Sequence, residues 1–216
     1  MSSFCNLARS YHLLETVAFG PVLNRARLAW IDHLATVDPI LLLGDGDGRS
    51  LCAILELNRG ANITSIDSSP TMIEQARQRI RRVHPHAMNR VSWRCQDIRE
   101  TRLPRNQYRA VVTQFFFDCF RQDEVIDIHG NISQSLKVDG RWIWSDFVVP
   151  NDPLRAFLAR SYLGLLYRFF RWQTDISAHH LPAVPPLFAK SGLRPAETQR
   201  FLFGTIESSV WVHADL

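Results

Sequence analysis

The order of hydrophobic patterns along the chain predicts an α/β fold: a doubly wound, mostly parallel sheet of seven strands with helices on both faces. Short apolar runs of strand type alternate with helical patterns, as in βαβ units. A glycine-rich segment stands where the first strand gives way to a helix. The last two apolar runs meet at Gly204, and so close a reversal makes the final pair antiparallel.

The first third of the chain predicts two strand–helix pairs. Residues 39–43 are continuously apolar, as a strand covered on both faces must be. A helix over 49–58 follows, and a second strand over 62–66 comes after its glycine stop. The next helix, with a serine and a proline at its start, covers 70–83.

The middle of the chain predicts three further strands and one helix. Residues 91–95 alternate apolar and polar side chains, and 108–113 form a fourth apolar run. Residues 122–136 have a mixed helical pattern. Asp139-Gly140 is a turn signal that leads into a fifth strand over 141–145.

The last third predicts a long helix and a terminal hairpin. An amphipathic helix over 154–172 follows two prolines, and a proline-broken connector covers 179–186. A short helix around 187–191 precedes the last two strands, over 197–203 and 206–212.

Composition excludes several classes of protein. A chain of 216 residues, 46% hydrophobic and 21% charged, indicates one folded domain rather than a disordered or coiled-coil protein. Four cysteines without a C-x-x-C pair predict neither a disulfide framework nor a zinc site. Histidine and acid spacing shows no metal-ligand pattern, so we expect no metal and a reduced, cytoplasmic setting.

Charge and hydropathy point to a protein that is soluble or at most peripheral to a membrane. The N-terminus has no signal pattern, and no stretch approaches the roughly 18 apolar residues of a membrane span. The net charge is +4, but the arginines are scattered along the whole chain. A general arginine bias explains this better than a phosphate-binding stripe, so we expect no nucleic-acid partner.

The glycine-rich segment, Gly44-Asp45-Gly46-Asp47-Gly48, differs from the G-x-G-x-x-G dinucleotide fingerprint. Two acids within it would repel a pyrophosphate and suit a positively charged ammonium or sulfonium group. Asp67 follows at the end of the second strand, at the separation where an acid takes ribose hydroxyls. The pattern favours nucleoside binding over a plain loop with a helix-capping acid.

These segments resemble the class I S-adenosylmethionine-dependent methyltransferases of small-molecule type. The similar segments are ILLLGDGDGRSL, SIDSSPTMIEQAR, CQDI, AVVTQFFFD and the terminal ETQRFLF-G-TIESSVWVH. The resemblance runs from about Tyr11 to His213. It implies a Rossmann-like sheet under an N-terminal helical cover, with S-adenosylmethionine (SAM) as cofactor and S-adenosylhomocysteine (SAH) as product.

At the methionine end of the cofactor, the resemblance implies that Gly44, Gly46 and Gly48 face the ligand. Many members carry an acid on the first strand two residues before the first glycine, where this chain has Leu42. Asp45 is therefore expected to contact the amino group instead.

At the nucleoside end, the resemblance implies that Asp67 holds the ribose and Met72 packs on the adenine face. Asp97 would accept from the adenine amino group, and the Ile98 amide would donate to the ring. Gln114 would border the transferable methyl group. Ser68 and Tyr11 complete the implied cofactor-binding set.

Methyl transfer from a sulfonium is an in-line displacement, so positioning supplies much of the acceleration. A general base is needed only where the acceptor must lose a proton. The candidate catalytic residues are Asp146 at the tip of the fifth strand, Asp118 after the aromatic segment, and His179 and His180 in the connector. The alternatives are a capping role for Asp146 and a solvated pair for the histidines.

Two segments outside the cofactor-binding core are expected to select the acceptor. Residues 11–34 look like an amphipathic cover, and the 154–172 helix looks like a lid rich in aromatic and arginine residues, which favours an apolar or aromatic small molecule. The alternative for that helix is peripheral contact with anionic lipid. Phe115 to Phe117 are either a pocket wall or part of the hydrophobic core.

We divide the single domain 1–216 into a helical cover (1–36), a cofactor-binding core (37–150), an inserted lid helix (151–182), and a last helix with terminal hairpin (183–216).

The leading functional hypothesis is SAM-dependent O-, C- or N-methylation of a small hydrophobic or aromatic acceptor in biosynthesis. The alternatives are a cyclase or isomerase on the same scaffold, an RNA methyltransferase, and a partner-binding subunit without activity. The segment Gln114-Phe115-Phe116-Phe117 lacks the D/N-P-P-Y/F tetrapeptide of nucleic-acid amine methyltransferases, and no Pro-Cys nucleophile is present. The sequence leaves the oligomeric state open.

Overall fold

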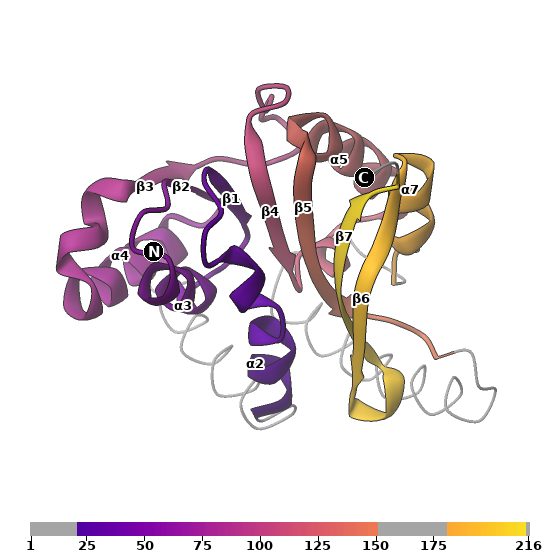
Figure 1. Cartoon of the computed structure of the whole chain (residues 1–216), viewed down its shortest axis with the longest axis horizontal. Coiled ribbons are helices and arrows are strands. Elements are labelled where there is room, and N and C mark those ends of the chain that lie inside the picture. Colours follow the sequence, from indigo (N-terminus) through magenta and orange to yellow (C-terminus); the bar gives the residue numbers. More distant parts are fainter. Residues whose placement is uncertain (1–20, 151–180, 215–216) are drawn as a thin grey trace.

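The computed structural model describes residues 21–150 and 181–214. Seven strands form one sheet in the order β3-β2-β1-β4-β5-β7-β6 (Figure 1). All neighbouring pairs are parallel except those of β7, which runs antiparallel to β5 and to β6. This confirms the predicted α/β class and the antiparallel C-terminal pair.

The N-terminal half of the sheet is built from strand–helix units. Its elements are β1 (Ile40–Leu43), α3 (Arg49–Leu57), β2 (Ile63–Asp67), α4 (Pro70–Val83) and β3 (Val91–Cys95). Ser69 caps α4, because its hydroxyl accepts from the Met72 amide at 3.3 Å. The predicted helix over 70–83 and strand over 91–95 are confirmed to the residue.

The C-terminal half extends the sheet on the other side of β1. Its elements are β4 (Tyr108–Gln114), α5 (Gln122–Ser135), β5 (Leu136–Phe147), α7 (Pro185–Lys190), β6 (Leu193–Phe201) and β7 (Ile206–His213). The chain leaves β1 toward β2 and returns to its other side as β4, so the strand order switches direction at β1. Such a switch point opens a crevice at the carboxyl ends of the strands.

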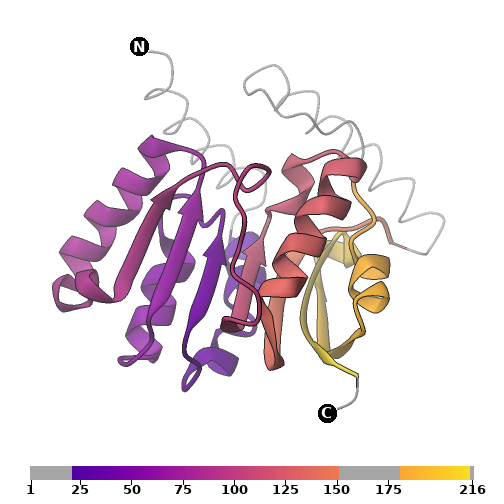
Figure 2. The same ribbon diagram turned by 90° about the horizontal axis from the view of Figure 1, so that it is seen from above.

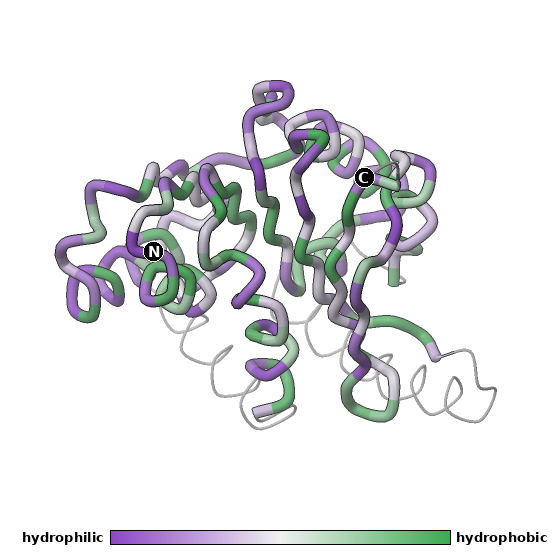
Figure 3. The backbone as a smooth tube through the Cα atoms, viewed as in Figure 1, coloured by the Kyte–Doolittle hydropathy of each residue, from purple (hydrophilic) through white to green (hydrophobic). Residues whose placement is uncertain are grey.

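Successive residues of β1 enter cores on opposite faces of the sheet. Leu41 and Leu43 pack in the cluster that holds α5 and α7, while Ile40 and Leu42 pack in the cluster that holds α3 and part of α4. Figure 2 shows the sheet between its helices, and Figure 3 shows hydrophobic stretches along the central strands. Burial on both faces explains why this strand is continuously apolar.

The structure describes the C-terminal part of the predicted cover, which consists of α2 (Pro21–Leu28) and a 3₁₀ turn (Ile31–Leu34). Leu23 and Ala26 of α2 are buried in a small cluster with Phe201 and Ile206. This helix therefore packs beside the terminal hairpin. Residues 1–20 and the predicted 154–172 helix lie outside the described residues.

Two strands differ clearly from their predictions. Strand β6 begins at Leu193 rather than Glu197 and ends at Phe201, because Leu202–Gly204 form a 3₁₀ turn. Strand β5 begins at Leu136 rather than Arg141, so the turn expected at Asp139-Gly140 is wrong. Tyr108 pairs with Leu136 and Ala110 with Arg141, so β5 carries extra residues between these two pairs. A Cβ on Gly140 would lie 2.7 Å from Leu136 Cδ1. Gly140 thus permits a tight irregularity within the β4–β5 pair, and an Asp-Gly sequence is compatible with such a bulge as well as with a turn.

Candidate functional site

The glycine loop after β1 borders a pocket of about 420 Å³ at the switch point of the sheet. Gly44 and Gly46 both have left-handed backbones, with φ of 64° and 66°. A Cβ on Gly46 would meet only Met72 Sδ, at 3.8 Å, so the loop presents its main chain to the pocket. The pocket is lined by Leu43, Gly44, Gly46, Ile66, Asp67, Ser68, Ser69, Met72, Gln96, Asp97, Ile98, Arg99, Phe115, Phe116, Cys119 and Phe120. Seven of the expected cofactor-binding residues are among them.

Asp67 is held in a defined orientation at the end of β2. Its Oδ2 accepts from the Gly46 amide at 3.2 Å, and its Oδ1 accepts from the Ser69 amide at 2.8 Å. Burial raises the pKa of the Asp67 carboxyl, and these two amides act in the opposite direction. Each oxygen keeps a further acceptor position, so the carboxylate can still receive two hydroxyl groups of a ligand.

The two acids inside the glycine loop do not line the pocket. Both oxygens of Asp45 accept amides at the start of α3, from Ser50 at 3.0 Å and Leu51 at 2.9 Å, and burial raises the Asp45 pKa to about 6. Asp47 pairs with Arg49 and Arg79. The expected contact of Asp45 with an amino group stays a prediction, although its carboxylate already stabilises a helix N-terminus.

Gly48 and Gln114 also lie outside the pocket wall. A Cβ on Gly48 would lie 2.9 Å from Ala76 Cα, so this glycine permits close packing of the loop on α4. Gln114 is 5% exposed; its Oε1 accepts from Ser50 Oγ at 2.5 Å, and its Nε2 donates to the Arg27 carbonyl at 2.5 Å. Gln114 therefore links β4 to α2 and α3. Its expected place beside a methyl group stays a prediction.

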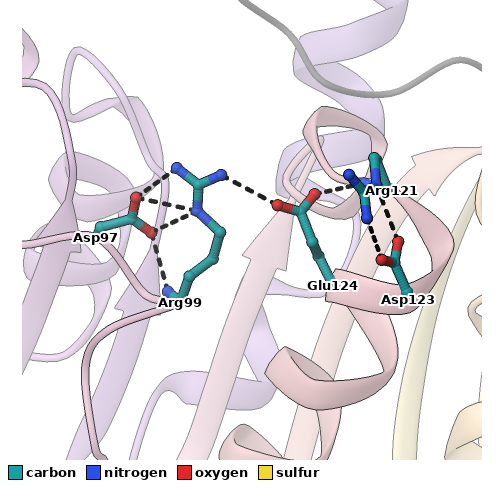
Figure 4. Close-up of polar contacts among 5 residues, drawn as sticks. All are labelled: Asp97, Arg99, Arg121, Asp123 and Glu124. Atoms are coloured by element: carbon teal, nitrogen blue, oxygen red, sulfur yellow. Dashed lines mark hydrogen bonds and ion pairs between the residues drawn. The ribbon is translucent and has the colours of Figure 1, made fainter.

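The end of the pocket formed by the loop after β3 holds an ion-pair network that the sequence did not predict. Asp97 accepts from the Arg99 amide at 2.9 Å and from its guanidinium at 2.6 to 3.1 Å. Arg99 also donates to Glu124 of α5 at 3.1 Å (Figure 4). The Arg99 guanidinium holds the pKa of Asp97 below its usual range. The local signal was an acid two residues before an arginine, but Glu124 is 25 positions away.

The three phenylalanines after β4 divide between the two roles that the sequence left open. Phe117 is fully buried in the core, while Phe115 and Phe116 line the pocket. The Phe116 ring lies against Gly44, and Phe115 adopts φ of 52° with its ring 5.3 Å from Phe147. One wall of the pocket is therefore aromatic, with Phe120 completing it.

Two candidate catalytic acids lie next to this aromatic wall, although neither is among the residues that line the pocket. Asp146 is 2% exposed, and its oxygens accept from the amides of Phe117 at 3.2 Å and Phe147 at 3.0 Å. Burial and the neighbouring Asp118 charge raise its pKa well above the usual range. Asp118 is half-buried, and burial raises its pKa to about 6. The other candidates, His179 and His180, and the cofactor candidate Tyr11 lie outside the described residues.

Neither a long apolar helix nor a metal cluster is found in the described ranges. No helix within 21–150 or 181–214 is long and apolar enough to cross a membrane. In the same ranges, no three histidine, cysteine, aspartate or glutamate side chains are grouped as metal ligands would be.

Comparison with known proteins gives one family model and many similar structures. Residues 40–140 match the model described as a methyltransferase domain. No curated protein sequence matches the chain.

The mitomycin 7-O-methyltransferase MmcR is 18% identical, with a TM-score of 0.69 over 99% of this chain and 61% of its own. An O-methyltransferase family 2 protein from Planctomyces limnophilus, in complex with apigenin, is 14% identical, with a TM-score of 0.68 over 96% and 62%. CalO1, a methyltransferase in calicheamicin biosynthesis in its SAH-bound form, is 21% identical, with a TM-score of 0.65 over 95% and 56%. This chain thus spans about three fifths of these proteins, and the likeness is one of fold.

Proposed function

We propose that this chain is a class I SAM-dependent methyltransferase that transfers the methyl group of SAM to a small apolar or aromatic acceptor, since residues 40–140 match the model of a methyltransferase domain. The observation that carries the proposal is the pocket at the switch point. It joins a glycine loop, an oriented acid at the end of β2 and an aromatic wall. Its volume of about 420 Å³ falls in the usual range for ligand pockets, about 300 to 1,000 Å³.

The residues present fit the cofactor. Asp67 has acceptor positions left for two ribose hydroxyls, and Gly44 and Gly46 expose main chain where a methionine moiety would lie. Met72 offers a half-buried thioether for an adenine face. Asp97 and the Ile98 amide would meet the edge of the base. Bound SAM supplies an electrophilic methyl group and leaves as SAH, a neutral thioether.

The acceptor side is proposed from the aromatic wall. Phe115, Phe116 and Phe120 offer apolar ring surface beside the glycine loop, which suits a flat, apolar acceptor. The names of two similar structures, a mitomycin 7-O-methyltransferase and a protein in complex with apigenin, support an aromatic acceptor with an oxygen nucleophile. We propose a phenol or enol as the acceptor group.

A phenol must lose its proton as the new carbon–oxygen bond forms, and we propose Asp118 as the base. With a pKa of about 6, the Asp118 carboxyl is mostly ionised at neutral pH, and its pKa is close enough to that pH for it to accept a proton from the acceptor. Asp146 is a positioning residue, since its carboxyl group binds the Phe117 amide next to Asp118. His179 and His180 stay alternative bases. Asp118→Asn is expected to slow transfer to a neutral phenol about 10²-fold and to leave SAH affinity unchanged.

The first experiment is calorimetric titration of SAM and SAH into the purified protein, Asp67→Ala and the control Asp32→Ala. Asp32 is an exposed acid outside the pocket. Loss of two charge-assisted hydrogen bonds predicts about 10²-fold weaker binding for Asp67→Ala and no change for the control. Equal binding by the folded Asp67→Ala variant would contradict this account of the pocket.

Product mass then separates the candidate functions. Phenolic acceptors are incubated with protein and SAM, and a product heavier by one methyl group supports transfer. A rearranged product of unchanged mass would identify a cyclase or isomerase instead. Methylation of bulk RNA, with no methylation of any small acceptor, would contradict the proposed acceptor class.

A further inference from the structure

Arg99 connects the nucleoside end of the pocket to a helix on the other half of the sheet. On one side its guanidinium and its amide donate to Asp97, on the loop after β3. On the other side its Nη1 donates to Glu124 Oε1 at 3.1 Å, in the first turn of α5 (Figure 4). Arg99 itself lines the pocket together with Asp97.

The hydrogen bonds of Asp97 leave little acceptor capacity for a ligand. An ionised carboxylate has about four acceptor positions. Three Arg99 donors occupy it: the amide at 2.9 Å, Nε shared between both oxygens at 3.0 and 3.1 Å, and Nη2 at 2.6 Å. About one position therefore remains for a donor that enters the pocket, and its direction is set by Arg99.

Glu124 holds Arg99 in this arrangement. The second oxygen of Glu124 accepts from the Arg121 amide at 2.9 Å, as part of the cap of α5. Its side chain is 20% exposed, whereas that of Arg99 is 48% exposed. The less exposed, doubly bonded acid thus anchors the more exposed cation, since fixing an exposed arginine costs side-chain entropy.

The loop that carries Asp97 has a second attachment to α5, independent of Arg99. Asn131 donates to the Thr101 carbonyl at 2.7 Å and accepts from the Leu103 amide at 3.2 Å. Substitution of Arg99 therefore leaves the loop attached to the helix. The effect of such a substitution reports on Asp97 rather than on folding of the loop.

We propose that Arg99, anchored by Glu124, is a positioning and specificity-determining residue that fixes the Asp97 carboxylate and directs its remaining acceptor position at the base of the bound nucleoside. An ionised carboxylate accepts and cannot donate, so the pocket favours a purine with a 6-amino group over one with a 6-oxo group. This inference rests on the proposed function, in which this end of the pocket holds adenine.

Other titratable groups surround Asp97 but do not replace Arg99. Asp67 and Cys119 lie across the same pocket, and Arg94, Cys95, Glu100 and Arg102 share the outer hollow with Asp97. Among the described residues, Arg99 is the group whose charge and hydrogen bonds lower the pKa of Asp97. Arg102 serves as a matched control, because it is an exposed arginine of the same loop that does not line the pocket.

The test is calorimetric titration of SAH and its 6-oxo counterpart, S-inosylhomocysteine, between pH 4 and pH 8. The variants are Arg99→Gln, Arg99→Lys, Glu124→Gln and the control Arg102→Gln, each checked for fold by circular dichroism. Arg99→Gln is expected to bind SAH about tenfold more weakly and to bind the 6-oxo compound within about twofold of wild type. Glu124→Gln is expected to show a smaller loss of the same kind, and Arg102→Gln none.

The pH profile separates positioning from a merely structural role. Wild-type SAH binding is expected to weaken toward pH 4 as Asp67, whose pKa burial raises, takes up a proton, whereas Asp97, whose pKa Arg99 lowers, adds little to this loss. In Arg99→Gln the Asp97 pKa returns toward its ordinary value of about 3.9, so binding between pH 7 and pH 4 falls about twofold more than in wild type. Arg99→Lys keeps a positive charge and is expected to restore the wild-type profile with part of the affinity.

Two outcomes would overturn the inference. If Arg99→Gln keeps the wild-type ratio of SAH to S-inosylhomocysteine affinity and the wild-type pH profile, Arg99 does not determine specificity. If Arg99→Gln binds SAH more tightly than wild type, Arg99 competes with the base instead of positioning its partner. Failure of the wild-type protein to bind SAH at all is a distinct result, and it would overturn the proposed function together with this inference.

Discussion

Substitution of Gly44 by alanine tests whether the glycine loop and the aromatic wall are packed as the structure shows. Gly44 has φ of 64°, a conformation that costs a residue with a Cβ about 1 kcal/mol or more. The new Cβ would lie 2.5 Å from Phe116 Cδ2 and 3.2 Å from Cε2, well inside van der Waals contact. Gly44→Ala therefore meets both a backbone and a packing penalty.

The packing penalty is not easily relieved, because the Phe116 ring is confined. It is 8% exposed and packs edge-on against Phe117 at 5.3 Å and Phe120 at 5.1 Å. Overpacking of this kind costs about 1 to 3 kcal/mol. Added to a backbone term of about 1 to 2 kcal/mol, it predicts that Gly44→Ala lowers the free energy of unfolding by about 2 to 5 kcal/mol.

The assay is urea denaturation followed by tryptophan fluorescence, with Gly46→Ala as the matched control. Gly46 has nearly the same φ, 66°, but its added Cβ would meet only Met72 Sδ at 3.8 Å. Its loss should be about 1 to 2 kcal/mol, from the backbone alone. In a Phe116→Ala background, the cost of Gly44→Ala should shrink to the same value.

Equal losses for Gly44→Ala and Gly46→Ala would refute this reasoning. So would a double-mutant cycle in which Phe116→Ala leaves the cost of Gly44→Ala unchanged. Either result would mean that the ring does not lie on the loop, and the aromatic wall of the pocket would have to be placed elsewhere.

Three further predictions concern stability. Asn58→Ala should lower the free energy of unfolding in urea by about 2 to 4 kcal/mol, since this buried side chain donates to the Leu34 and Val37 carbonyls and accepts from the Gly60 and Ala61 amides. The exposed Asn89→Ala is its control, and equal losses would contradict the account. Gly130→Ala in α5 should add about 0.5 to 1 kcal/mol, because nothing lies within 4 Å of the new Cβ, and a loss of stability would show a contact that the structure lacks. Burial raises the folded-state pKa of Asp118 from 3.8 to about 6, so its contribution to stability is complete below pH 4 and is lost as pH rises through 6. The free energy of unfolding of Asp118→Asn should match that of wild type at pH 4 and exceed it by about 1 to 3 kcal/mol at pH 7. An equal difference at both pH values would argue against a raised pKa.

The pocket shows which site residues a local pattern can locate. Gly44, Asp67 and Asp97 follow three strands that the sequence indicates individually, and parallel neighbours bring their carboxyl ends to one edge. The meeting of these residues is therefore a consequence of strand order. The same logic placed Phe115 and Phe116 near the pocket without deciding whether they line it.

Side-chain direction was not predictable in the same way. Asp45 lies in the middle of the glycine loop, but its carboxylate points to α3, because the orphan amides of Ser50 and Leu51 are nearby. Gln114 ends β4 as expected, but its amide group contacts Arg27 of α2 and Ser50 of α3, which are 87 and 64 positions away. Hydrogen bonds over such separations depend on how elements pack, which a single strand or loop does not encode.

The sequence by itself determined the fold class and the succession of strands and helices along the chain, and it singled out the glycine loop and Asp67 that border the pocket, because periodicity and turn residues act locally. Only the tertiary structure decided that Arg99 is shared between Asp97 and Glu124, and that Asp118 and Asp146 are neighbours. The physical reason is that ionisation and orientation of a carboxylate depend on burial and on charges from other elements. Those neighbours exist only once the sheet and its helices have assembled.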